Sequence, residues 1–262
     1  MTTEEAPRIF TSDYYERMRQ LEAGSWWNAG MRDIALGLFR QANLPETGRL
    51  LDIGCGSGQT MSWFLGAHPR WTAAGADVAP DGVVAAHSHG LAVATGNALA
   101  LPFALESADL VVTLDVLQHL PLNGGDVKSL AEMLRVLRPG GYLFIRTNCQ
   151  AFPKTRDDPA NDFRKYTPEL LEKNVRLAGF DIVRLSRANS LLGLAEVARE
   201  VRATKAEGKG YHGLLAVPRK QAGLTFAAKR AVLRAEASFI ARGAKLPLGR
   251  SIVAMCRKPL RA

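Results

Sequence analysis

The sequence predicts an α/β fold in which a doubly wound, mostly parallel sheet of seven strands carries helices on both faces. Three observations predict it. From Arg49 onward, short apolar runs alternate with stretches of helical periodicity, which is typical of parallel strands joined by helical crossovers. Glycine and proline close helical stretches, as at 139–141. The 262 residues, 47% of them hydrophobic, are enough for one large domain with an insertion and a full core.

Local patterns define the individual elements. Met31, Ile34 and Leu38 recur at helical spacing, whereas the run 110–114 is continuously apolar apart from one threonine and reads as a buried strand. Thr167 can cap a helix whose first position is a proline. The expected strands are 50–53, 73–77, 91–95, 110–114, 142–146, 180–185 and 251–256. The expected helices are 13–23, 27–43, 60–67, 80–87, 126–137, 168–178, 191–203 and 224–241.

The charge of the chain is strongly basic and unevenly distributed. The formal net charge is +9, and eleven Lys or Arg fall between residues 199 and 245 beside only three Glu. Such an excess suits nucleic acid, an anionic membrane surface or an anionic substrate, and charge alone does not choose among them. No apolar run reaches the roughly 18 residues of a membrane span, and residues 1–7 do not resemble a secretory leader. A cytoplasmic protein without a transmembrane segment is therefore expected, with its three widely spaced cysteines reduced.

A glycine-rich turn follows the first predicted strand. Residues 52–58 read Asp-Ile-Gly-Cys-Gly-Ser-Gly, so three glycines stand at alternate positions. Glycine lacks a Cβ and tolerates positive φ, which lets a ligand approach the backbone closely. A strand, turn and helix at the carboxyl end of a parallel sheet suit a nucleotide-like ligand. A dinucleotide fingerprint would require a further glycine or alanine where Gln59 stands, so the spacing disfavours NAD.

The pattern Asp-x-Gly-x-Gly-x-Gly after an apolar strand resembles motif I of the class I, Rossmann-like, S-adenosylmethionine-dependent methyltransferases of the small-molecule type. Four further segments resemble the same family and follow in the family's order: Asp77 at the end of the second strand, the Gly-Asn-Ala segment from residue 96, the strand and loop 108–120, and the turn 137–143. Five segments in order favour this resemblance over an isolated glycine-rich turn.

The resemblance implies S-adenosyl-L-methionine as the cofactor. Asp77 would accept hydrogen bonds from both ribose hydroxyls, which suits a carboxylate, and Asn97, where the family usually has Asp, would accept one from the adenine amino group. Arg32 would meet the methionine carboxylate. Two simpler interpretations stay open, namely that Asp52 caps the next helix and that Asp77 is a solvated strand-end carboxylate. The residues expected to bind the cofactor are Asp52, Gly54, Cys55, Gly56, Gly58, Asp77, Val78, Asn97, Ala98, Leu114, Asp115 and Arg32.

His119 is the candidate catalytic residue. Methyl transfer from a sulfonium is an in-line displacement, so the enzyme must mainly align the acceptor in a water-poor pocket. A general base helps only if the acceptor must lose a proton, and imidazole titrates near working pH. His119 follows the fourth strand, near the position that the resemblance gives to the methyl group. The alternative is that its ring packs against the cofactor without acting as a base.

Three residues are candidates for binding the acceptor. Arg164 and Tyr166 belong to an Arg-x-Tyr-Thr element that resembles one on the acceptor side of many small-molecule members, and Trp27 lies on a helix that folds over the cofactor in the family. Arg164 or Tyr166 would orient a carboxylate, phosphate or hydroxyl. In the alternative, Tyr166 packs against the sheet, Arg164 pairs with Asp162, and Trp27 is an ordinary packing residue.

No metal site is expected. His87 and His89 are two residues apart and do not share a helical face. The loop carboxylates Asp157, Asp158 and Asp162 fit poorly to the cation motif of catechol-type methyltransferases, so solvated side chains are the better interpretation.

The predicted organisation has four parts: an N-terminal helical lid at 1–48, the cofactor-binding core at 49–190, a basic helical insertion at 191–249 that covers the substrate, and the last strand of the core at 250–262. On the helix 224–241 we expect one buried apolar face, made of Leu224, Ala228, Ala231, Val232, Ala235 and Phe239, and a solvated basic face. Peripheral membrane contact by this insertion is the alternative. Arg230 and Arg234 are expected to favour a negatively charged acceptor.

A small-molecule acceptor, methylated on oxygen or nitrogen, is the favoured substrate: an anionic metabolite, a sugar or a natural-product intermediate. The Asn/Asp-Pro-Pro-Tyr/Phe element of base-methylating enzymes is absent after the fourth strand, where Leu114 and Asp115 stand. The basic segment also lacks an aromatic stacking surface, so nucleic acid is not expected. The alternatives are an RNA- or protein-directed methyltransferase and a regulatory protein that binds the cofactor without transfer.

Overall fold

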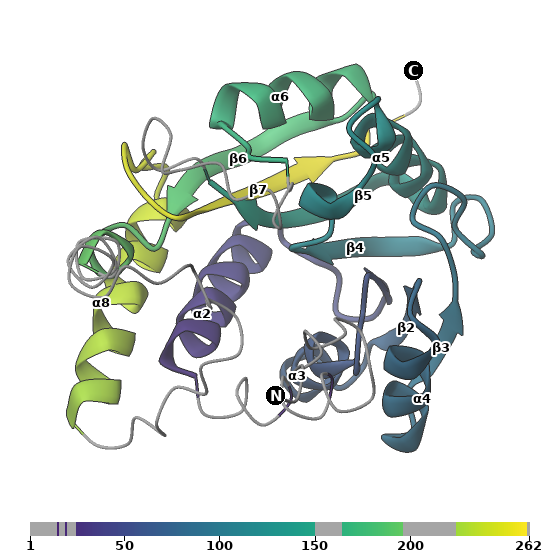
Figure 1. Ribbon diagram of the computed structural model, residues 1–262, viewed down its shortest axis with the longest axis horizontal. Helices are drawn as coiled ribbons and strands as arrows, with labels where there is room; N and C mark the ends of the chain where they lie inside the picture. The colour runs from purple at the N-terminus through teal and green to yellow at the C-terminus, as the bar shows by residue number, and fades with distance from the viewer. Residues whose placement is uncertain (1–14, 16–18, 20–24, 150–163, 196–223, 261–262) are drawn as a thin grey trace, which may run out of the picture.

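A seven-stranded mixed sheet forms the centre of the molecule (Figure 1). The computed structural model describes residues 15, 19, 25–149, 164–195 and 224–260. The strand order is β3-β2-β1-β4-β5-β7-β6, in which β7 runs antiparallel to both β5 and β6 and the other pairs are parallel. The predicted fold class is confirmed. The strands are β1 (Arg49–Ile53), β2 (Thr72–Asp77), β3 (Ala92–Thr95), β4 (Ala108–Leu114), β5 (Leu137–Asn148), β6 (Asp181–Ala188) and β7 (Ser251–Arg257).

The helices divide between the two faces of the sheet, as Figure 1 shows. Because successive side chains of a strand point to opposite faces, Val111 of β4 belongs to the core under α5 and α6, whereas Leu110 and Val112 belong to the core under α2, α3 and α8. The helices are α2 (Trp26–Gln41), α3 (Gln59–Ala67), α4 (Pro80–Ser88), α5 (Gly125–Val136), α6 (Pro168–Leu177) and α8 (Leu224–Ala241), with a short 3-10 helix, η1 (Leu117–His119), after β4.

Helix α2 packs directly on the sheet. The Ser25 side chain caps it by accepting a hydrogen bond from the Asn28 amide. Phe39 meets Phe64 of α3 and Phe144 of β5 edge to face, with ring centroids 5.9 and 5.4 Å apart. Most of the residues before Ser25, including Tyr14, lie outside the described residues, so the lid at 1–48 stays a prediction for that segment.

Helix α8 packs beside α2 but turns a different face inward from the one expected. The residues it buries are Leu233, Glu236, Ala237 and Ile240, whereas Leu224 and Phe239 are exposed. The expected apolar face was therefore wrong. The reason is a carboxylate inside the contact: Glu236 accepts hydrogen bonds from the Ser190 and Leu191 amides, so a charged residue occupies the buried stripe. Residues 196–223 lie outside the described residues.

The basic residues of α8 also contact α2. The guanidinium of Arg230 donates to both carboxylate oxygens of Asp33, at 3.2 and 3.3 Å, and Arg234 lies 3.8 Å from the same carboxylate. These two arginines thus contact α2, and their expected role in selecting the acceptor stays a prediction. Within the described residues, no helix is long and apolar enough to cross a membrane.

Candidate active site

The glycine turn after β1 requires glycine at two of its positions for packing. Gly54 and Gly58 have φ of +78° and +77°. A Cβ on Gly54 would lie 2.2 Å from Val116 Cγ2, and one on Gly58 would lie 2.1 Å from Leu91 Cδ1. A side chain at either position would strain the backbone and displace a neighbouring side chain.

Gly56, in the middle of the turn, differs from its neighbours. Its φ is +50°, and a Cβ there would approach only the Tyr15 ring, at 3.1 Å. The same ring would contact a Cβ on Gly82 of α4, at 2.9 Å. The Tyr15 ring thus lies against both Gly56 and Gly82, at the mouth of the turn.

Asp77 organises this turn from the end of β2. Its Oδ2 accepts a hydrogen bond from the Gly56 amide at 2.7 Å, and its Oδ1 accepts one from the Ala79 amide at 2.9 Å. Each carboxylate oxygen retains a further acceptor site, so the group can still receive two ribose hydroxyls. The neighbouring Val78 is exposed, so its side chain offers an apolar surface beside the turn. Asp77 is therefore bound into the turn instead of being solvated at the strand end.

Two further residues of the predicted cofactor set lie beneath the turn. Asp52 is buried at the end of β1. Burial raises the pKa of the Cys55 thiol, and the charges of Asp52 and Asp77 raise it further. Cys55 is therefore a protonated packing residue at neutral pH, with no thiolate available for chemistry.

Asn97 lies in the loop after β3, next to Ala98. Its side-chain oxygen accepts a hydrogen bond from the Leu99 amide at 2.8 Å, which closes a local turn. The residue is exposed, so the remaining lone pair of that oxygen and the amide NH₂ face outward.

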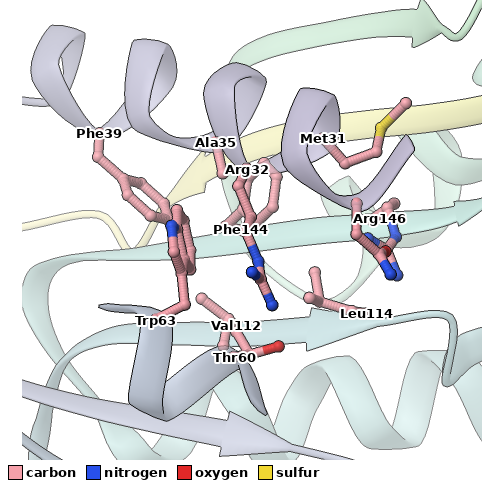
Figure 2. Close-up of a pocket in the computed structure, with 11 residues that line it drawn as sticks. Met31, Arg32, Ala35, Phe39, Thr60, Trp63, Val112, Leu114, Phe144 and Arg146 are labelled. Carbon is pink, nitrogen blue, oxygen red and sulfur yellow. The ribbon is translucent and has the colours of Figure 1, made fainter. Parts of the chain in front are cut away.

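A small pocket opens where β4 and β5 end, under α2. Its volume is about 40 Å³, and its walls include two guanidinium groups and three aromatic rings. Figure 2 shows the Arg32 side chain extending from α2 toward the sheet, with Arg146 and Leu114 lining the same pocket. The Arg32 guanidinium lies 5.7 Å from the Trp63 ring, and that of Arg146 lies 4.6 Å from the Trp27 ring.

Asp115 joins this pocket to the loop that follows β4. Its φ is +58°, an uncommon value for a residue other than glycine. Arg146 donates to Asp115 Oδ2 from both Nε, at 3.0 Å, and Nη2, at 2.6 Å. The Asp115 amide in turn donates to the Arg146 carbonyl at 2.8 Å. Asp115 therefore contributes a charge that fixes Arg146, a role that its predicted place in the cofactor set did not include.

His119 lies at the exposed surface of the same loop, with its Nε2 3.4 Å from the Gln118 side-chain amide. Close packing on one side of the ring desolvates it and lowers the pKa of His119, while the charge of Asp115 acts in the opposite direction. The imidazole is consequently neutral at pH 7 and able to accept a proton.

Arg164 and Tyr166 form a closed structural cluster around Asp126. The Tyr166 side chain is fully buried and donates its hydroxyl hydrogen to Asp126 Oδ2 at 2.8 Å, and Asn174 donates to the same oxygen at 2.7 Å. Arg164 forms an ion pair with Asp126 and donates to the carbonyls of Pro121 and Leu122, at 3.0 and 2.8 Å. These contacts favour the packing interpretation of both residues over acceptor binding. Asp162, the partner considered from sequence, lies outside the described residues, as do Asp157 and Asp158.

Sequence reasoning missed Arg146, Trp63 and Asp126. Arg146 ends the otherwise apolar run Tyr-Leu-Phe-Ile at the carboxyl end of a buried strand. A cation in that position is itself an indication of a functional residue. Asp126 and Trp63 look like ordinary helical residues in the sequence. Among the described residues, no group of three His, Cys, Asp or Glu is placed to hold a metal ion.

Comparison with known proteins identifies the cofactor-binding core. Residues 51–145, which span the strand of the glycine turn through β5, match the family described as "Methyltransferase domain". A "SAM-dependent methyltransferase, possible histamine N-methyltransferase" from Thermotoga maritima has the same fold, with a TM-score of 0.57 and 19% identity over 94% of this chain and 95% of its own. Residues 51–145 therefore form a methyltransferase domain, and the fold is that of S-adenosylmethionine-dependent methyltransferases. S-adenosylmethionine is accordingly its cofactor, and the glycine turn and Asp77 fit that molecule.

Relatives of this methyltransferase act on different acceptors. A malonyl-[acyl-carrier protein] O-methyltransferase from Methylococcus capsulatus is 27% identical over 201 residues, which cover 72% of this chain and 69% of the relative. A tRNA (carboxymethyluridine(34)-5-O)-methyltransferase from Arabidopsis thaliana is 31% identical over 103 residues, or 39% of this chain. The chain spans only 24% of the Arabidopsis protein's length. The acceptors named for these relatives therefore differ.

Proposed function

We propose that this protein transfers a methyl group from S-adenosylmethionine to an oxygen or nitrogen atom of an anionic small molecule. The observation that carries the proposal is the pocket at the ends of β4 and β5, where two guanidinium groups face a small enclosed space beside the loop after β4. An acceptor must meet the methyl group in a confined, water-poor site. A pocket of this size accommodates a head group of a few atoms, which suits a small molecule better than a folded macromolecule.

The cofactor is proposed to lie along the glycine turn, with its ribose on Asp77 and its base against Val78 and the loop of Asn97 and Ala98. When bound, it supplies an electrophilic methyl group on a sulfonium centre. Asp52, Cys55 and the three glycines shape the floor beneath it. Arg32, which shares its pocket with Thr60 at the start of α3, is proposed to hold the methionine carboxylate. Tyr15, lying over Gly56, supports the proposed N-terminal lid at 1–48.

His119 is proposed to accept the proton when the acceptor is a hydroxyl or an amine. Its lowered pKa keeps the ring neutral at working pH, and it lies four residues beyond Asp115 on the loop after β4. The insertion at 191–249 is proposed to cover the acceptor, since α8 packs beside α2 at the same side of the sheet.

An RNA acceptor is the second candidate, because the Arabidopsis relative is named as a tRNA methyltransferase and the chain has a net charge of +9. Against it, the arginines of α8 that pair with Asp33 are engaged in packing and not available for a phosphate backbone. A strong salt dependence of acceptor affinity would favour RNA, because phosphate contacts release counterions.

Calorimetric titration with S-adenosylmethionine and its demethylated product tests the cofactor site. We expect wild-type protein to bind both and Asp77→Ala to lose roughly 2–4 kcal/mol of affinity, since two charge-assisted hydrogen bonds disappear. Asp81→Ala, in the first turn of α4, is the matched control and should bind normally. No heat with wild-type protein, or undiminished affinity in Asp77→Ala, would refute the proposal.

Transfer itself is tested by a screen of acidic and neutral acceptors with a labelled methyl group. Labelling of at least one acidic small molecule is expected. Cofactor binding without transfer to any small molecule, tRNA or protein fraction would favour the regulatory alternative.

A further inference from the structure

Arg146 stands out among the described arginines because it is largely buried and yet only partly engaged. Its side chain is 14% exposed. Nε and Nη2 both donate to one oxygen of Asp115, and the guanidinium plane lies over the Trp27 ring. A guanidinium carries five N–H donors, and within the described residues nothing accepts a hydrogen bond from Arg146 Nη1. A buried cation with unused donors requires an acceptor to offset its desolvation.

Arg146 is also part of the pocket wall. Arg146 lines the space beneath α2 together with Arg32 and Leu114 (Figure 2). Leu114 pairs with Arg146 in the register of β4 and β5, so the guanidinium leaves the sheet at the level where the loop to His119 begins. An acceptor approaching the methyl group must pass this position in the proposed active site.

Arg32 and Arg146 serve different ligands in this arrangement. Arg32 comes from α2 and lies over Trp63 of α3, on the side of the glycine turn. Arg146 comes from β5 and lies over Trp27, with Asp115 behind it. The methionine carboxylate proposed for Arg32 therefore leaves Arg146 for a second anion.

The charges around Arg146 favour a carboxylate over a phosphate. Arg32, Arg146 and Asp115 together carry a charge of +1, so a singly charged anion brings this group of three side chains to neutral. A phosphate dianion next to Asp115 would be poorly compensated. The planar fork of arginine also matches the planar carboxylate group.

We propose that Arg146 anchors a carboxylate of the methyl acceptor, so that this methyltransferase selects carboxylic acids, with Asp115 and Trp27 holding the guanidinium in position. This inference rests on the proposed function for its biological meaning, but the anion site can be measured separately from transfer.

The test uses the indole N–H signal of Trp27 in ¹⁵N spectra of the full chain. Acetate, its neutral isostere acetamide and inorganic phosphate are titrated at constant ionic strength, with and without saturating S-adenosylhomocysteine. The variants are Arg146→Gln, Arg146→Lys, which keeps the charge but loses the fork, and Arg138→Gln. Arg138 is the matched control because it lies on the same strand and pairs bidentately with Asp109 outside the pocket.

Acetate should shift the Trp27 signal saturably, phosphate more weakly and acetamide not at all. The apparent dissociation constant for acetate should rise at least tenfold in Arg146→Gln, less in Arg146→Lys, and stay unchanged in Arg138→Gln. Equal binding of acetamide, tighter binding of phosphate, or undiminished acetate binding in Arg146→Gln would overturn the proposal.

Cofactor binding separates this proposal from the proposed function. Arg146→Gln and Arg146→Lys should bind S-adenosylhomocysteine as wild type does. Loss of that binding in both variants would assign Arg146 to the cofactor and overturn the inference. Failure of wild-type protein to bind S-adenosylhomocysteine would instead refute the proposed function, while the acetate titration of the free protein still reports on Arg146.

Discussion

Two arginine–aspartate pairs flank the loop between β4 and α5, and they differ in how completely their hydrogen bonds are satisfied. At the start of the loop, Asp115 holds Arg146 by two donors, and Arg146 also lines a pocket. At its end, Asp126 accepts from Tyr166 and Asn174 and pairs with Arg164, which also donates to two loop carbonyls. We call the pair of Asp126 and Arg164 the closed pair, because its hydrogen bonds are satisfied. We call the pair of Asp115 and Arg146 the open pair, because the guanidinium keeps unused donors.

In our proposal, this difference separates the structural pair from the pair that binds a ligand. A buried polar network adds stability only when its members are satisfied, as they are around Asp126. Arg164 also ties Pro121 and Leu122 in place, so the closed pair holds the loop that carries His119. The open pair then presents a guanidinium at the other end of the same loop.

Asp126→Ala should produce the largest effect on stability. Arg164 would lose its buried counter-ion, and breaking a buried pair costs about 3–5 kcal/mol. Urea unfolding measures this loss. Glu172→Ala, which removes an exposed pair with Arg176 on α6, is the control and should cost no more than about 0.5 kcal/mol. Equal losses in the two variants would mean that the buried pair of Asp126 stabilises the fold no more than an exposed pair does.

His119→Asn should reduce transfer to a hydroxyl or amine acceptor by about 100-fold, or ~2.7 kcal/mol, if the ring is the base. Because the pKa of His119 is lowered, the acid limb of wild-type kcat/KM should lie below pH 6.5 and disappear in the variant. Protonation also favours the unfolded state, so the contribution of His119 to stability should fall as pH drops through 6.5. An unchanged pH–rate profile in His119→Asn would exclude the base role.

Tyr166→Phe should have an intermediate effect on the closed pair. It removes one hydrogen bond to a buried carboxylate and should cost about 1–3 kcal/mol. Burial raises the pKa of Tyr166, so in wild-type protein the unfolded chain should ionise first and stability should fall above pH 10. Tyr142→Phe, on β5, serves as the comparison in urea unfolding. A fully stable Tyr166→Phe that lost acceptor affinity would instead restore the substrate-binding role of Tyr166.

Arg230→Gln should have the smallest effect. Its pair with Asp33 is partly exposed, and such pairs are worth about 0–1 kcal/mol. Because Arg230 holds α8 on α2 and does not line the pocket, the KM of an acidic acceptor should not change. A severalfold rise in that KM, measured with labelled methyl transfer, would instead indicate that Arg230 of α8 contributes to acceptor binding.

The sequence contained enough to predict the sheet, the glycine turn and the cofactor, because all three depend on local patterns. Alternating apolar runs define the strands. The turn has glycine at positions 54 and 58, where a Cβ would meet a neighbouring side chain. Side-chain partners distant in the chain were not predictable. Arg164 meets Asp126 across 38 residues, and α8 buries Glu236 because the Ser190 amide, 46 residues away, donates to it. The acceptor side of the site is built from such contacts.

Parallel unfolding of Arg146→Gln and Arg164→Gln tests the contrast between the two pairs most directly. Removing Arg164 leaves Asp126, 3% exposed, without its counter-ion, whereas removing Arg146 leaves Asp115, 35% exposed, in contact with water. We expect Arg164→Gln to lose about 3–5 kcal/mol of unfolding free energy and Arg146→Gln about 1 kcal/mol or less, with S-adenosylhomocysteine binding intact in the latter. Equal losses, or a larger loss for Arg146→Gln, would contradict the assignment of Arg146 to a ligand.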